Sequence, residues 1–363
     1  MTRTATPRAP ATAGFDVHRT PSSLAPLEDA WRELVRGVPG SSYFITPDWV
    51  LGSWQAMDPA ASAEVAVWTG PGGRVEAVVP LVRVRERLHR RLPFPVTCWT
   101  LLGAGADAAD HGLLPALPHR RDDVRAFLKA RVGQGSCWFP ATDPQADPGL
   151  LPPGTRRITT MTCPRLTIGP DSAVGSRSLR QLMARRRRQL AAAGVSFRWV
   201  PPQEMTAEVT DTVMRLHRAR QDVKGTTTAF GPGRRGFHLW LQARAGPGRG
   251  PAALLAERDG IAVGAVYGFL WQNTFAYYNG GWDAAYARMS LGTVLLYEAI
   301  ATVAGAGVET FDFLRGDETY KYRSFGAQDR HDESWLRPRS PAALLAGAAL
   351  GLHALGPRRR RSG

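Results

Sequence analysis

The sequence predicts an α/β protein (α+β mixed sheets) with two similar halves, each a mostly antiparallel mixed sheet flanked by helices. Alternating apolar runs indicate strands, and the strand, turn, strand, strand order of residues 74–102 recurs at residues 254–280, with helices in front of each. A chain of 363 residues can also hold two cores. We therefore predict domains at residues 15–165 and 176–338, between a disordered tail at residues 1–14 and a C-terminal helix with a basic tail at residues 339–363.

The first half is expected to begin with helices at residues 24–37 and 43–55. Thr46-Pro47-Asp48 opens the second helix, since Thr suits the N-cap and Pro the first helical position. The elements that follow are strands at residues 64–69, 74–83 and 97–102, a helix at 121–132 and a Pro-, Asp- and Gly-rich loop at 141–154. A domain boundary is expected between residues 164 and 176.

The second half is expected to begin with a helix at residues 178–193 that ends at Gly194. Its apolar stripe comprises Leu179, Leu182, Met183 and Leu190. Asp259-Gly260 predicts a type I′ turn, because both positions of that turn need a positive φ. The other expected elements are strands at 195–200, 254–257, 261–270, 274–280 and 309–314, helices at 208–221 and 292–306, and a loop at 226–236.

The formal net charge of +15 suggests attraction to polyanions. Nearly all the positive charge is Arg, since Lys occurs only at positions 129, 224 and 321. A bias toward Arg, Ala, Gly and Pro is typical of a GC-rich genome, so the charge is weak support for nucleic-acid binding. Small ligands that carry phosphate would explain it equally well.

The three cysteines, Cys98, Cys137 and Cys163, have the spacing of neither a disulfide framework nor a zinc site. We expect packed thiols and no metal. The first 14 residues lack the apolar core of a signal peptide, so the cytoplasm is the expected location.

The segment at residues 341–356 is rich in Ala, Leu and Gly and precedes four Arg at 358–361. It is shorter than the roughly 20 residues that a membrane-spanning helix needs. We expect a docked terminal helix. The alternatives are an interfacial membrane helix anchored by the basic tail and a true membrane span.

Residues 311–323, FDFLRGDETYKYR, concentrate charge and Tyr at the end of a predicted strand. The preceding segment, residues 292–308, has Glu298 as its only charged residue. Polar residues that follow a buried element are typical of a site on a rigid scaffold. The candidate catalytic residues are Asp312, Arg315, Asp317, Tyr320 and Lys321.

Residues 288–293, RMSLGT, join a predicted strand to the apolar helix. Small residues at such a junction expose backbone N–H groups at a helix N-terminus, where a phosphate binds well. The signal is weak by itself, because many helices begin with Ser-x-Gly. The candidate ligand contacts here are Arg288, Ser290, Leu291, Gly292 and Thr293.

Two further residues have both a structural and a functional interpretation. Arg186 lies within the apolar stripe of its helix, so it either snorkels to solvent or reaches an anionic ligand between the domains. His217 lies beside an apolar face that also carries Arg220, and is either structural or part of a site.

The order of strand meander, R-x-S-x-G-T turn, apolar helix and strand resembles the GNAT (GCN5-related N-acetyltransferase) superfamily. Ser290 stands where the first Gly of the family's pyrophosphate loop, R/Q-x-x-G-x-G/A, would be. The sequence is more similar still to the CelD-like branch, which is related to the FemABX peptidyltransferases. The motifs that carry this resemblance are the basic helix 185–194, LHRAR at 216–220, GWD at 281–283 and DFLRGDxxYK at 312–321, within residues 177–325.

The resemblance implies transfer of an acyl group from acetyl-CoA or another acyl-CoA to an amine. Such a reaction needs an N–H group that polarises the thioester carbonyl, a base for the amine and an acid for the departing thiolate. The backbone of Tyr278 and Gly280 is the candidate for the first role, because two consecutive glycines permit a bulge. Asp312, Asp317 or Glu318 would be the base, and Tyr320 the acid.

The remaining candidates concern the substrate. Its expected contacts are Arg186, His217, Arg220, Trp282 and Asp283. By the resemblance, Arg315 and Lys321 contact substrate phosphates; the alternative is an ion-pair network with the neighbouring carboxylates.

The turn of the first half that corresponds to the phosphate loop, residues 103–114, reads GAGADAADHGLL. Asp110 would repel a pyrophosphate there, so we expect this half to shape the acceptor side and not to bind CoA. A catalytic dyad of Asp110 and His111 is disfavoured, because adjacent residues rarely face each other.

The sequence therefore predicts a tandem-GNAT N-acyltransferase whose acceptor, a small-molecule or cell-envelope precursor amine, binds between the halves. An alternative is FemABX-like transfer of an aminoacyl group from tRNA, which the net charge and the four Arg at 185–188 would suit. A second alternative is a non-catalytic GNAT-fold module in polysaccharide or envelope assembly.

Overall fold

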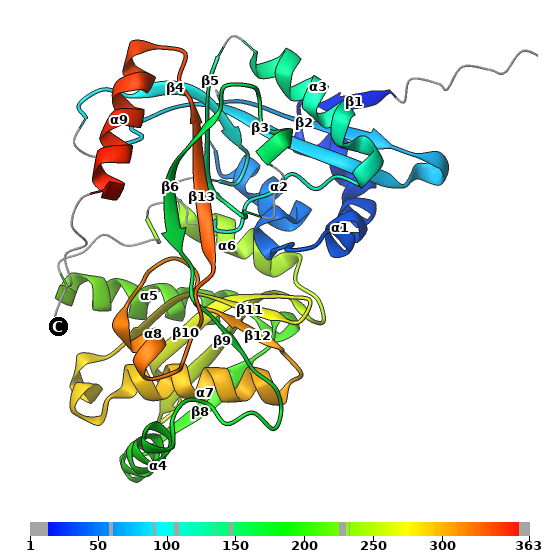
Figure 1. The fold of residues 1–363 in the computed structure, drawn as a ribbon. Helices are drawn as coiled ribbons and strands as arrows, with labels where there is room; N and C mark the ends of the chain where they lie inside the picture. Colours follow the sequence, from blue (N-terminus) through cyan, green and yellow to red (C-terminus); the bar gives the residue numbers. More distant parts are fainter. Residues whose placement is uncertain are drawn as a thin grey trace, which may run out of the picture.

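The computed structural model describes residues 14–57, 61–89, 92–104, 109–133, 135–144, 148–224, 230–231 and 233–355. Within these residues the chain forms two mixed sheets, which Figure 1 shows one above the other. The α/β fold class is confirmed. Residues 1–13 of the predicted tail at 1–14, part of the predicted loop at 226–236 and the basic tail lie outside the described residues.

The first sheet has seven strands in the order β1-β2-β3-β4-β5-β13-β6. Neighbouring strands are antiparallel except β4 and β5, which are parallel. The strands are β1 (Phe15–His18), β2 (Ser62–Thr69), β3 (Val75–Glu86), β4 (Val96–Leu101), β5 (Ser136–Thr142), β6 (Arg156–Thr162) and β13 (His331–Arg337).

The second sheet has six strands in the order β7-β12-β11-β10-β9-β8. Here β11 and β12 are the parallel pair. The strands are β7 (Arg165–Thr167), β8 (Val195–Val200), β9 (Arg249–Arg258), β10 (Ile261–Trp271), β11 (Thr274–Trp282) and β12 (Thr310–Asp312). Asp259 and Gly260 have φ angles of 52° and 76°, so the predicted turn between β9 and β10 is confirmed.

The helices pack on both faces of each sheet. They are α1 (Glu28–Gly37), α2 (Pro47–Gln55), α3 (Arg121–Val132), α4 (Arg177–Ala192), α5 (Ala207–Lys224), α6 (Arg234–Ala243), α7 (Leu291–Gly305), α8 (Thr319–Arg323) and α9 (Pro341–Leu355). Thr46 caps α2 by accepting a hydrogen bond from the N–H of Trp49, with Pro47 at the first helical position, as predicted. The order strand, strand, strand, helix, strand occurs twice, as β2-β3-β4-α3-β5 and β9-β10-β11-α7-β12.

The largest core lies between the two sheets and draws on both halves of the chain. Trp31, Tyr43 and Trp49 from the first half pack in it with Phe237 and Phe269 from the second. The ring of Tyr43 stacks on that of Phe269 at a centroid distance of 5.0 Å. The opposite face of the second sheet packs on α4 and α7. The two halves therefore share an apolar interior.

The predicted boundary at residue 338 is wrong. The chain returns to the first sheet after α8, and β13 lies between β5 and β6 (Figure 1). Residues 165–167, predicted to be the end of the first domain and the start of a linker, form β7 in the second sheet. Each sheet is completed by a strand that local patterning assigned elsewhere, so the halves are interlocked.

Helix α9 docks on the first sheet, with Ala343 and Ala346 buried against Leu336 and Val96. Leu344 and Leu345 on the same helix are exposed. Among the described helices, none is long and apolar enough to cross a membrane.

Two details of the second half differ from the sequence patterns. Leu182, expected in the apolar stripe of α4, is 45% exposed, while Leu179, Met183 and Leu190 are buried as predicted. Arg186 donates to Gln189 on the same helix. Because α4 packs on α7 and β8, on the side of the sheet away from the first half (Figure 1), Arg186 does not lie between the domains, and that expectation is wrong.

Candidate functional site

Strands β11 and β12 separate after three residue pairs. Thr274 pairs with Thr310 and Ala276 with Asp312, where β12 ends, whereas β11 continues to Trp282. A cavity of about 780 Å³, called here the splay cavity, opens at this point. Its lining includes residues from α5, β11, the start of α7 and the loop after β12, namely Asp110, His217, Arg220, Gln221, Tyr277, Tyr278, Asn279, Gly280, Trp282, Ala287, Ser290, Leu291, Gly292, Thr293, Leu296, Phe313, Leu314, Arg315, Glu318, Tyr320, Lys321 and Phe325.

A β-bulge interrupts β11 at the cavity. Asn279 pairs with Tyr267 and Tyr277 with Gly268, so the register of the two strands shifts by one residue at Tyr278. A bulge turns a backbone group away from the ladder and toward its surroundings. The bulge expected near the glycines is therefore present, two residues before Gly280. Burial raises the pKa of the Tyr278 hydroxyl to about 12, so that it stays protonated at neutral pH.

Helix α5 lies directly on β11 beyond the bulge. A Cβ atom at Gly281 would lie 2.4 Å from the carbonyl carbon and oxygen of Leu216, so only glycine allows this approach. His217 follows Leu216, and its Nδ1 is 3.2 Å from the carbonyl oxygen of Gly280. His217 is thus buried against the strand and also lines the cavity.

The N-terminus of α7 forms the opposite wall of the splay cavity. Ser290 has a φ of 57°, a left-handed conformation that favours glycine and explains why the GNAT loop has Gly at the matching position. The first N–H groups of a helix have no intrahelical acceptor and carry the positive end of the helix dipole. Leu291, Gly292 and Thr293 line the cavity at this end.

Arg220 and Trp282 face the start of α7. The guanidinium of Arg220 lies 4.3 Å from the centre of the Trp282 ring, and that ring would be 2.8 Å from a Cβ atom at Gly292. Within the described part of the chain, the Nε of Arg220 is buried and has no hydrogen-bond partner. A cation and a helix N-terminus therefore meet on one cavity wall, as suits an anionic group.

The loop after β12 is tied to the first half of the chain. Asp110 accepts hydrogen bonds from the backbone N–H and the Nε of Arg315 at 2.8 and 2.7 Å. Burial raises the pKa of Asp110, and Arg315 counteracts this rise. Asp312 accepts from the N–H of Leu314, whose φ is 53°. Asp110 was not among the site residues predicted from sequence, since nothing local links it to Arg315.

Lys321 lies beneath the same loop. Its Nζ donates to the carbonyl of Gly316 at 3.0 Å and approaches those of Phe313 and Arg315, and it pairs with Glu318 at 2.8 Å. Tyr320 lines the cavity and is 39% exposed. Burial, Tyr277 and Glu318 all raise the pKa of Tyr320.

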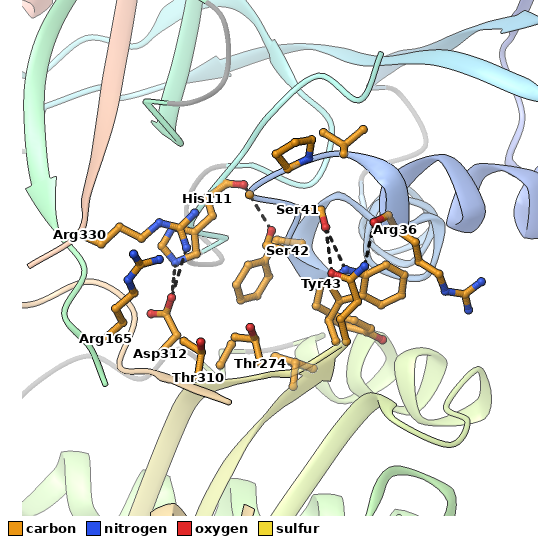
Figure 2. Close-up of a pocket in the computed structure, with 18 of the residues that line it drawn as sticks. Arg36, Ser41, Ser42, Tyr43, His111, Arg165, Thr274, Thr310, Asp312 and Arg330 are labelled. Atoms are coloured by element: carbon orange, nitrogen blue, oxygen red, sulfur yellow. Dashed lines mark hydrogen bonds and ion pairs between the residues drawn. The ribbon is translucent and has the colours of Figure 1, made fainter. Parts of the chain in front are cut away.

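Asp312 faces away from the splay cavity, into a buried charge cluster (Figure 2). His111 Nε2 lies 3.1 Å from Asp312, and His111 Nδ1 lies 2.8 Å from Asp332. Arg330 contacts Asp312 at 3.5 Å and also pairs with Asp143. Burial lowers the pKa of His111, but Asp312 and Asp332 outweigh it and raise this pKa to about 10. Burial raises the pKa of Asp312, but His111 outweighs it, so this pKa is lowered.

Some predicted site residues lie elsewhere. Asp317 and Arg288 are exposed and outside the lining of the splay cavity. Asp283 accepts from the N–H of Ala285 and caps the turn before α7. In the first half, Leu113 and Leu114 fill the region beside β4 and β5, which leaves a cavity of about 20 Å³.

One group of three described side chains, His111, Cys163 and Asp332, has its polar atoms within 4.8 Å of one another. Both ring nitrogens of His111 face carboxylates, so its imidazole is protonated at neutral pH and does not suit a metal ion. The three cysteines are free and buried, and burial raises their pKa values.

The fold and site define a mixed α/β protein with a ligand cavity between two parallel strands that separate. Residues 177–322 match the family model for the acetyltransferase (GNAT) domain. Within these residues the chain is similar to a GNAT domain, as the sequence resemblance predicted. None of the curated proteins matches the sequence significantly.

Several solved structures share the fold over most of the chain. FemX is 10% identical, with a TM-score of 0.60 over 92% of this chain and 100% of its own. The C-terminal domain of a putative lysylphosphatidylglycerol synthetase from Agrobacterium fabrum is 13% identical, with a TM-score of 0.57 over 90% and 96% of the two chains. L-PGS from Bacillus licheniformis is 10% identical, with a TM-score of 0.52 over 81% and 90%.

Proposed function

We propose that the protein is an N-acyltransferase that moves an acyl group from acyl-CoA, in the simplest case acetyl-CoA, to an amine. The observation that carries the proposal is the splay cavity, which runs from the N-terminus of α7 to α5 through the gap between β11 and β12. A donor and an acceptor can meet in such a gap without crossing the sheet.

The donor side is the wall formed by α7 and Arg220. The N–H groups of Leu291 and Gly292 at the start of α7 and the guanidinium of Arg220 would hold the pyrophosphate of CoA. Ser290 and Thr293 add hydroxyl groups at the same end. The backbone at the Tyr278 bulge would polarise the thioester carbonyl, because Tyr278 lines the same cavity.

The acceptor side is the wall formed by Asp110 and the loop after β12. Of the three carboxylates expected as the base, Glu318 lines the splay cavity, whereas Asp312 and Asp317 do not. We assign Glu318 to deprotonate the amine and Tyr320 to protonate the departing thiolate. Tyr320 lines the cavity beside Glu318 and is protonated at neutral pH, as a proton donor must be. Asp110 holds Arg315 beside both, so that the first half shapes the acceptor side.

Calorimetric titration with acetyl-CoA tests the donor site. Saturable binding is expected in the wild type, with affinity reduced about tenfold or more in Arg220→Ala, because a charge-assisted contact to phosphate is lost. Arg218→Ala is the matched control, because Arg218 lies on the same helix but is exposed and outside the cavity. Absence of binding to the wild type, or equal loss in both variants, would contradict acyl-CoA dependence.

The acceptor class is a small amine or an amine of a cell-envelope precursor. A panel of such amines with acetyl-CoA, followed by detection of free thiol, identifies the acceptor. The buried free cysteines fit a reducing compartment, so we place this reaction in the cytoplasm.

The second candidate is transfer of an aminoacyl group from tRNA. The observation in its favour is the outer face of α4, where Arg185, Arg187 and Arg188 are exposed. Retention of charged tRNA that falls with salt, and that is lost when Arg185 and Arg188 are reversed to Glu, would favour this reaction. Arg74→Glu is the control, since Arg74 is exposed on the turn before β3 in the first half.

A further inference from the structure

A second cavity of about 440 Å³, called here the inter-half cavity, lies between the two halves (Figure 2). One wall is the segment at residues 36–44, which begins in the last turn of α1, and the other is formed by β10, β11 and β12. His111, Arg165 and Arg330 close one end, and Arg36 lies toward the other. It shares no lining residue with the splay cavity.

The two cavities are back to back. Ala276 of β11 and Asp312 of β12 line the inter-half cavity. The residues that directly follow them in the chain, Tyr277 and Phe313, line the splay cavity. Successive side chains of an extended chain point to opposite faces, so the wall between the cavities is the thickness of one sheet. A ligand of one cavity therefore does not occupy the other.

The lining of the inter-half cavity is cationic. It contains Arg36, Arg165, Arg330 and His111 against a single carboxylate, Asp312. Asp312 is already neutralised by His111 at 3.1 Å and Arg330 at 3.5 Å.

The arginines differ in how far they are paired. Arg36 pairs with Glu33, and Arg330 pairs with Asp143. Arg165 has no carboxylate partner among the described residues, and its side chain ends beside Arg330 and His111 (Figure 2). The charges of His111 and Arg330 are compensated by Asp312, Asp332 and Asp143, so Arg165 is the cation at this end of the cavity that an anionic ligand would pair with.

We infer that the inter-half cavity is a second ligand site, which binds a small molecule through a carboxylate or phosphate group held by Arg165. The planar guanidinium suits either anion. The volume of the inter-half cavity suits a small molecule. Hydroxyl groups of Ser42, Thr274 and Thr310 line the middle of the cavity and would hold polar parts of the ligand. The rings of Phe269 and Trp271 would contact its apolar part.

The test uses inorganic phosphate and succinate as separate probes, titrated by calorimetry into the full chain at low ionic strength, where ion pairs are least screened. The wild type should bind at least one probe saturably, and the stronger probe distinguishes phosphate from carboxylate ligands. Arg165→Ala should weaken binding about tenfold or more, because it removes a charge-assisted contact. Arg165→Lys keeps the charge but not the planar fork, and should lie between the two.

Arg218→Ala is the matched control, because Arg218 is exposed and lies outside the lining of both cavities, so probe binding should be unchanged. Both variants should have the same melting temperature as the wild type. Arg165 in particular is exposed at the start of a short strand. The inference is overturned if neither probe binds, if Arg165→Ala binds as tightly as the wild type, or if Arg218→Ala weakens binding as much as Arg165→Ala does. Acetyl-CoA titration of Arg165→Ala separates this outcome from failure of the proposed function, because the splay cavity is intact in that variant.

Discussion

His111 makes the stability of the protein depend on pH in the alkaline range. Its pKa is about 10 in the folded protein and 6.5 in an unfolded chain, so the folded state binds the proton more tightly. The resulting stabilisation is complete below about pH 6.5 and is lost as the pH rises through about 10. Each unit of difference in pKa corresponds to about 1.4 kcal/mol, so the effect reaches a few kcal/mol.

We predict that His111→Gln removes this alkaline loss. The variant should be less stable than the wild type at pH 7, because Asp312 and Asp332 lose their cationic partner, and the gap should narrow toward pH 10. Urea unfolding between pH 7 and pH 10 measures both trends. Parallel loss of stability in the two proteins over this range would show that His111 is not the group responsible.

Lys321 has a structural role that the sequence pattern did not separate from ligand binding. It is 2% exposed, and its Nζ holds three carbonyl oxygens of the loop after β12. Lys321→Met should therefore lower the free energy of unfolding by about 2–4 kcal/mol, because buried acceptors lose their donor. Chemical denaturation measures this, and a loss below about 1 kcal/mol would return Lys321 to a role in ligand binding.

Tyr320 is expected to matter for turnover and not for folding. If it protonates the leaving thiolate, Tyr320→Phe should lower kcat about 100-fold or more and leave KM for acetyl-CoA nearly unchanged. Tyr322→Phe is the matched control, because the Tyr322 hydroxyl bonds to Asp329 at 2.6 Å and lies outside the splay cavity. Equal kcat values for Tyr320→Phe and the wild type would exclude Tyr320 as the acid.

Sequence reasoning found the residues of the splay cavity that lie close together along the chain. The turn before α7 and the 311–323 segment each carry a local pattern, and Ser290, Gly292, Arg315 and Tyr320 all line the cavity. Sequence reasoning missed two features of the site: Asp110 lines the splay cavity, and Asp312 lies outside it. Both depend on contacts across about 200 residues, from Asp110 to Arg315 and from His111 to Asp312, which no local pattern encodes.

At the scale of elements, the contact of α5 with β11 depends on one glycine. Gly281→Ala would place a methyl group 2.4 Å from backbone atoms of Leu216, which cannot rotate away. We expect a loss of about 1–3 kcal/mol or more in the free energy of unfolding. Gly305→Ala is the control, because a Cβ atom there meets nothing within 4 Å at the end of α7, and its helix propensity should stabilise by up to about 1 kcal/mol. Equal unfolding free energies for the two variants would contradict the close packing.

The elements predicted correctly have strong local signals. The Asp-Gly turn fixes the β9–β10 hairpin, and the Thr-Pro pair fixes the start of α2. Strand β13 was missed because its sequence, HDESWLR, is polar, although Asp332, Ser334 and Leu336 alternate as buried residues along it. Strand β13 is buried because it pairs with β5 and β6 of the first sheet. Both strands are distant in sequence, so the residues around β13 give no sign of this pairing.

At the scale of the whole molecule, the interlocked halves should unfold together. Strand β13 follows the GNAT-like residues 177–322 in the chain but lies inside the first sheet, between β5 and β6, and the largest core contains residues of both halves. Loss of either half would therefore expose the core of the other. Differential scanning calorimetry should show one transition, with a van't Hoff enthalpy equal to the calorimetric enthalpy. Two resolved transitions, or a calorimetric enthalpy about twice the van't Hoff value, would mean that the halves fold independently despite the shared strand.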